Sequence, residues 1–126
     1  MRRQVRTLQA HCVSLLGRHL EELLEDCGDL LHVLPSDARA SLLAVARRRG
    51  LLDDSALLSL CDEGWAVLDL SGCGRAVTDH AVCRLAAEGR LRSLVAADLR
   101  RCEGVSRAGL LALAGGAPRL RTLRLG

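Results

Sequence analysis

Five residue types are missing from this 126-residue chain: lysine, isoleucine, asparagine, phenylalanine and tyrosine. Their codons are rich in adenine and thymine, so their joint absence indicates a GC-rich coding sequence. Arginine supplies all 18 positive side chains for the same reason, which makes the net charge of +3 weak evidence for nucleic-acid binding. A single tryptophan is the whole aromatic content, so the stacking residues of single-strand RNA binders are missing. We therefore expect no nucleic acid among the partners.

Long apolar runs and metal-ligand spacings are missing as well. No stretch of 18 apolar residues occurs, which argues against a transmembrane helix and a membrane partner. There is no C-x-x-C pair, and the four histidines do not form a zinc-finger spacing with the six cysteines. No acid–base pair or glycine-rich phosphate loop is evident. We expect no metal, no cofactor and no enzyme activity.

The start of the chain does not resemble a secretory signal, because charged residues and His11 interrupt it before any long apolar run. An arginine-rich transit peptide is a weaker alternative. Six cysteines without a secretory signal predict free, packed thiols in a reducing compartment. The expected location is the cytoplasm, the nucleus or both.

What the sequence does contain is a short pattern that occurs twice and begins a third time. It reads apolar-x-x-apolar-x-Leu-x-x-Cys, and its copies start at Trp65, Leu94 and Leu120. The starts are 29 residues apart (65 to 94) and then 26 residues apart (94 to 120). This pattern and period are typical of the strand segment of a leucine-rich repeat.

Each of the two complete patterns is followed by a second shared segment, 77–86 and 105–114, with apolar residues at the spacing of a short amphipathic helix. Thr78 or Asp79, and Ser106, are suited to cap these helices at their N-termini. A similar segment, 52–60, precedes the first strand. The sequence therefore predicts an α/β fold, a short leucine-rich-repeat solenoid with parallel strands on the concave side and helices on the convex side.

The first 50 residues are expected to form an N-terminal helical cap on the repeats of 51–126. An apolar stripe runs from Val5 to Leu34, where Pro35 should end the first helix, with a break near Gly28. Ser36 or Asp37 should cap a second helix over 38–49, and Gly50 should end it. At the other end the last repeat is incomplete, so we expect a truncation there or a docked partner.

Partner-binding residues follow from the alternation of side chains along a strand. Residues between the inward leucines should point to the concave face, together with Val67 and Ala96. Asp69, Asp98 and Arg124 share one position on successive strands and should form a ladder. They serve either as a recognition surface or as a solvated face whose charges pair with one another. The candidate site is Asp69, Ser71, Asp98, Arg100, Arg101, Thr122 and Arg124.

Several segments resemble a known family: Leu34-Pro35, Leu42-Leu43, the run 48–54, Leu57-Leu58, the run 67–73 and 77–79. They are similar to the ribonuclease-inhibitor-like family of the antagonist of mitotic exit network protein and its plant relatives. The repeats also resemble the cysteine-containing repeats of F-box proteins. The resemblance covers about residues 5–126, and it implies a non-catalytic binding protein linked to cullin-type ubiquitin ligases or cell-cycle control. Departures from the family pattern are Ala97, Arg107, a longer loop over 90–93 and the small number of repeats.

Two functions are therefore expected from different classes. The first is a scaffold or substrate-recognition protein that binds a protein partner through its concave face. The second is a degenerate F-box subunit, in which Leu34-Pro35 and the following helix dock an adaptor of a ubiquitin ligase.

Overall fold

The computed structural model describes residues 19–26, 31 and 33–126 of the chain. Within these residues the chain alternates short helices with three-residue strands. The elements are α2 (Leu20–Asp26), α3 (Ser36–Arg48), α4 (Asp54–Leu60), β1 (Val67–Asp69), α5 (Asp79–Ala87), β2 (Ala96–Asp98), α6 (Arg107–Gly116) and β3 (Thr122–Arg124). The described part of the chain is therefore a mixed α/β fold.

The three strands form one parallel sheet in the order β1-β2-β3. Leu68 is in register with Ala97, and Ala97 is in register with Leu123. These are the equivalent positions of the three sequence patterns, so the prediction that they lie in consecutive parallel strands is confirmed. The pattern thus fixes both the strands and their register, because a slip by one residue would turn the leucines outward.

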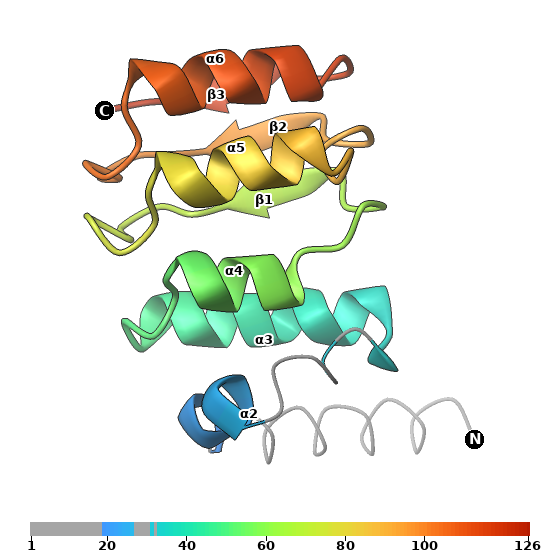
Figure 1. Ribbon diagram of the computed structural model, residues 1–126, viewed down its shortest axis with the longest axis vertical. Helices are drawn as coiled ribbons and strands as arrows, with labels where there is room; N and C mark the ends of the chain where they lie inside the picture. The colour runs from blue at the N-terminus through green and yellow to red at the C-terminus, as the bar shows by residue number, and fades with distance from the viewer. Residues whose placement is uncertain (1–18, 27–30, 32) are drawn as a thin grey trace.

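The helices lie on one side of the sheet and are stacked in chain order from α4 to α6 (Figure 1). Contacts join α3 to α4, α4 to α5, and α5 to α6. Each of the strands β1 and β2 therefore leads into a helix that packs beside the helix of the preceding unit. This arrangement leaves the opposite face of the sheet uncovered by any described element (Figure 1).

The core between the helices and the sheet consists of leucine, valine, alanine and cysteine. Leu57 and Leu60 from α4 and Leu85 from α5 are each at most 1% exposed. Leu70, Leu94 and Leu99 fill the sheet side of the same cluster. Leucine dominates because the chain has no isoleucine or phenylalanine with which to fill the same volume.

The N-terminus of the helix α3 differs from the prediction. Its first residue is Ser36 and its N-cap residue is Pro35, and no side chain caps it, so the prediction of Ser36 or Asp37 as the cap is wrong. Proline already has the backbone φ needed at a helix entrance, and the helix therefore begins directly after it. The other end agrees with the sequence, since Gly50 follows the C-cap residue with a φ of +72°.

The predicted first helix, from Val5 to Leu34, falls largely outside the described residues. Its described portion contains α2, where Leu20 is buried and both glutamates of the first turn are exposed. The expected break near Gly28 lies outside the described residues. None of the helices in the described ranges is long and apolar enough to cross a membrane.

Candidate functional site

The uncovered face of the sheet carries the alternate residues of the three strands. Val67 is 64% exposed and Asp69 is half-buried, whereas Leu68 between them is buried. The same alternation holds in β2, and all three residues of β3 are exposed. A hollow of about 400 Å³ lies along this face, which we call the strand face.

The predicted ladder across the strand face is present. Asp69 is in register with Asp98, and Asp98 with Arg124. Neighbouring strands are about 4.8 Å apart, so Asp98 lies one strand spacing from Asp69 and one from Arg124. The ladder therefore places two carboxylates and one guanidinium in a row on adjacent strands.

Asp98 forms an ion pair with Arg100, two residues later in the chain. The guanidinium of Arg100 donates from Nη2 to Oδ2 of Asp98 at 2.7 Å and from Nε to Oδ1 at 3.0 Å. The backbone N–H of Arg100 adds a third contact to Oδ1 at 3.1 Å. These bonds from Arg100 lower the pKa of Asp98 to about 2. Asp98 and Arg100 thus form an ion pair in which half of the Arg100 side chain is exposed.

Asp69 has a different set of partners. It accepts hydrogen bonds from the backbone N–H of Ser71 at 3.0 Å and from the Ser71 hydroxyl at 2.7 Å. Nη2 of Arg47 lies 3.6 Å from its Oδ2. Ser71 is buried, at 8% exposure, so this predicted site residue orients Asp69 and is not itself open to a partner.

Arg47 is a strand-face residue that the sequence analysis missed. It comes from α3, and its Nη1 is also 3.4 Å from the backbone oxygen and the hydroxyl of Ser71. Its Nε is buried and has no hydrogen-bond partner. Arg47 lies in the last turn of α3, where a basic residue is common for local reasons, so its sequence position does not reveal this long-range contact.

Three predicted site residues are exposed: Arg101, Thr122 and Arg124. Neither arginine forms an ion pair in the described part of the chain. Arg101 has a φ of +56°, in the left-handed region that non-glycine residues rarely adopt. Gly72 has a φ of +80° at the equivalent place after β1. The second unit therefore holds an arginine where the first has a glycine.

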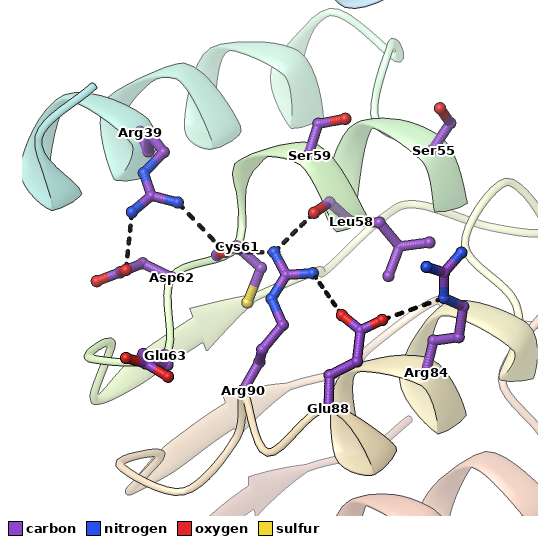
Figure 2. Close-up of a pocket in the computed structure, with 10 residues that line it drawn as sticks. All are labelled: Arg39, Ser55, Leu58, Ser59, Cys61, Asp62, Glu63, Arg84, Glu88 and Arg90. Carbon is purple, nitrogen blue, oxygen red and sulfur yellow. Dashed lines mark hydrogen bonds and ion pairs between the residues drawn. The ribbon is translucent and has the colours of Figure 1, made fainter. Parts of the chain in front are cut away.

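A second hollow, of about 580 Å³, lies beside α3, α4 and α5 (Figure 2). All of its charged side chains except Glu63 are engaged in ion pairs within the chain. Nη2 of Arg39 is 2.7 Å from Oδ1 of Asp62, and Nη1 of Arg90 is 3.2 Å from Oε1 of Glu88. Nη2 of Arg90 also donates to the backbone oxygens of Leu58 and Cys61, each at 2.6 Å.

Arg90 therefore satisfies carbonyl groups at the end of α4, as cations near a helix C-terminus do. The sequence analysis had noted Arg90 as part of a lengthened loop and had not found this role. The Cys61 thiol of this hollow is buried, and burial raises its pKa to about 11. The arrangement explains how the charged side chains around the hollow are held.

The cysteines at the equivalent strand ends are packed, as predicted. The four described cysteines are free thiols. Sγ of Cys102 donates to the backbone oxygen of Leu70 at 2.8 Å, which ties one unit to the next. Burial raises the pKa of Cys73 to about 11 and raises that of Cys102. The other two cysteines, Cys12 and Cys27, lie outside the described residues.

In the described ranges, no three histidine, cysteine, aspartate or glutamate side chains are grouped as metal ligands. A comparison of the chain with protein-family models, curated proteins and solved structures finds no match.

Proposed function

We propose that this chain is a leucine-rich-repeat solenoid with an N-terminal helical cap over 1–50, which binds a protein partner through its strand face. The repeated sequence pattern supports the solenoid, as do the parallel register of β1, β2 and β3 and the stacked helices on one side. The chemistry of the face supports a binding role. The strand face carries a row of charged groups, Asp69, Asp98 and Arg124, on adjacent strands.

The observation that carries the proposal is the conformation of Arg101. A left-handed backbone costs a non-glycine residue roughly 1 kcal/mol. The described hydrogen bonds of Arg101, with Gly74 and Gly126, are made by its backbone and would be kept by glycine, so its exposed side chain gains no described contact that offsets this cost. Strained residues of this kind concentrate at binding sites. A partner that accepts hydrogen bonds from Arg101 and Arg124 would account for an arginine at this position.

The resemblance described above adds a class of partner. We propose components of a cullin-type ubiquitin ligase or a cell-cycle protein as the first candidates, in the cytoplasm or nucleus. The F-box alternative needs an apolar helix face that is open to an adaptor. In α3 the apolar residues Leu42, Leu43 and Ala46 are buried within the chain, which favours the strand-face interpretation.

The test is affinity purification followed by measured affinities for each recovered partner. Wild type is compared with Asp98→Arg and with Arg101→Gly. The matched charge control is Arg48→Glu, at an exposed position of α3. We expect either strand-face change to weaken binding about tenfold, the effect of one charged hydrogen bond. Unchanged binding of every partner by both variants would disprove the role of the strand face.

A further inference from the structure

Two ion pairs lie next to each other on the strand face. Nη2 of Arg47 is 3.6 Å from Oδ2 of Asp69 on β1, and Arg100 is paired with Asp98 on β2. Described elements border both pairs, because β2 lies between β1 and β3, and α3 supplies the arginine beside β1. The two aspartates are in register, so the pairs are one strand spacing apart. We call these four residues the ion-pair cluster.

The two carboxylates of the ion-pair cluster are largely occupied by donors of their own chain. Both oxygens of Asp98 accept hydrogen bonds from the Arg100 side chain, and only 15% of the aspartate side chain is exposed. Oδ1 of Asp69 accepts two bonds from Ser71, and Oδ2 lies beside Arg47. A basic partner would have to displace these donors before it could pair with either aspartate. The aspartates therefore hold the arginines in place.

The arginines of the ion-pair cluster have donors to spare. Nη1 of Arg100 makes no hydrogen bond within the described residues, and half of this side chain is exposed. The bonds from Arg47 to Ser71 are long, at 3.4 Å, and its buried Nε has no partner among the described residues. A guanidinium has five N–H donors, so several remain unused. Arg124 on β3 adds a third guanidinium beside the two carboxylates, which makes the net charge positive.

The neighbouring part of the strand face is apolar. Val67 precedes Asp69 by two residues and is 64% exposed, and Ala96 precedes Asp98 by two residues. This valine and alanine line the hollow of about 400 Å³. Side chains that are two residues apart on a strand are separated by about 7 Å, so this is the distance from the apolar floor to the ion-pair cluster. Alternate side chains of an extended partner segment have the same separation.

We propose that the strand face binds an extended polypeptide segment in which an aspartate or glutamate lies two residues from an apolar side chain. The carboxylate accepts hydrogen bonds from Arg100 and Arg47, and the apolar side chain enters the hollow at Val67 and Ala96. This proposal rests on the strand-face function proposed above and adds the chemistry of the partner. The loss of binding expected for Asp98→Arg then comes from displacement of Arg100, which Asp98 holds.

The test selects peptides from a displayed library of random short sequences on the immobilised full chain. We expect the bound sequences to be enriched in aspartate or glutamate two positions from an apolar residue. The same selection on Arg100→Glu should favour lysine or arginine there, because the variant reverses the charge that the peptide meets. Arg48→Glu, the same change of charge at an exposed position of α3, should select the same sequences as wild type. A variant that failed to fold could not reverse the preference.

A fluorescent peptide measures the size of the effect. It contains one valine and one glutamate two positions apart in a serine background. We expect glutamine in place of the glutamate to weaken binding by about tenfold, the effect of one charged hydrogen bond, and lysine to weaken it further. Moving the glutamate next to the valine should also weaken binding, because adjacent side chains of an extended segment point to opposite sides.

Several outcomes would overturn the proposal, and they separate it from the strand-face function. Enrichment of basic sequences on wild type, or of no sequence, overturns it. If those basic sequences bind less well to Asp98→Arg, the strand-face function stands and only the partner's charge is wrong. If wild type, Asp98→Arg and Arg100→Glu select identical sequences, both fail. Equal effects of Arg100→Glu and Arg48→Glu, or equal competition by single-stranded RNA, would show a general attraction for anions and overturn the proposal too.

Discussion

Asp54 and Thr78 lie 24 residues apart in the sequence and share two hydrogen bonds, from the Thr78 N–H to Oδ1 at 2.7 Å and from its hydroxyl to Oδ2 at 2.5 Å. Thr78 also caps α5, because its hydroxyl oxygen accepts the N–H of His80. Thr78 therefore caps α5 and also bonds it to α4. The hydrogen bonds between α4 and α5 are therefore made at the N-terminus of α5.

Removal of the two hydrogen bonds between Asp54 and Thr78 should destabilise the protein. We expect Asp54→Ala to lower the free energy of unfolding by about 1–2 kcal/mol, since two hydrogen bonds to a carboxylate are lost. Urea denaturation of Asp54→Ala, Thr78→Ala and the double variant measures the coupling between the two residues. Glu63→Ala, an exposed carboxylate with no described contact, is the control and should change little. Additive effects of the two single changes would contradict a direct contact.

Two neighbouring glycines near the end of α6 should respond in opposite ways to alanine. A Cβ at Gly115 meets nothing within 4 Å, whereas one at Gly116 would lie 2.7 Å from Cβ and 3.0 Å from Cα of Ala86 in α5. Gly115→Ala should stabilise the protein by up to about 1 kcal/mol through helix propensity. Gly116→Ala should destabilise it by about 1–3 kcal/mol, because the two helices are forced apart.

Thermal unfolding of the two glycine variants provides the comparison, and each is the other's control for helix propensity. If both changes stabilise the protein, α5 and α6 are not in close contact at Ala86. If both destabilise it, the space beside Gly115 is filled.

Arg101→Gly separates stability from binding. Glycine has no penalty at a φ of +56°, so this change should raise the free energy of unfolding by up to about 1 kcal/mol. Arg100→Gly at the adjacent position is the control and should not stabilise, because Arg100 holds Asp98 and does not have a positive φ. A loss of stability in Arg101→Gly would mean that the arginine makes a stabilising contact that its exposure conceals.

The strands and caps of the repeats were predictable because each depends on local pattern. Leucines at alternate positions identified the register of Leu68 with Ala97. The residues before an amphipathic run predicted Thr78 or Asp79 as a cap, and Thr78 is the N-cap residue. Ser106 shows the limit of such reasoning. It occupies the N-cap position as predicted, yet its side chain makes no cap bond and its hydroxyl donates to Asp79 instead.

Contacts between distant segments were not predictable. Arg47 reaches Asp69 and Ser71 from a helix more than 20 residues earlier, and Arg90 caps α4 from the loop after α5. Arginine is common throughout this chain, so no local signal marks the arginines with long-range partners. The same contacts decide which predicted site residues are open, because they bury Ser71 and orient Asp69.

The cysteines should differ in reactivity according to burial. The thiolate is the reactive form, and burial raises the pKa of Cys61 and Cys73 to about 11. Cys83 is exposed on α5. We expect iodoacetamide at neutral pH to alkylate Cys83 well before Cys61 or Cys73, as measured peptide by peptide with mass spectrometry. In urea the rates should become similar, and a fast reaction of Cys61 in the folded protein would contradict its burial.

The ion pair of Asp98 and Arg100 should make stability depend on pH in the acidic range. Bonds from Arg100 lower the pKa of Asp98 from its ordinary value of 3.8 to about 2 in the folded chain. A lowered pKa means that folding favours the ionised carboxylate. Its contribution is fully present above the unfolded pKa, and it is lost as the pH falls from about 4 toward 2.

Asp98→Asn keeps the shape of the side chain but removes this titration. We expect the variant to be less stable than wild type at pH 7, by less than about 1 kcal/mol because Arg100 is half exposed. Urea denaturation at intervals from pH 6 to 2 should show the difference to be constant above about pH 5 and to shrink below pH 4. Wild type should also lose this contribution at neutral pH in 1 M salt, which screens exposed charges. A difference that is independent of both pH and salt would mean that Asp98 contributes through shape and hydrogen bonding alone, and the strand face would then present Arg100 as an unpaired cation.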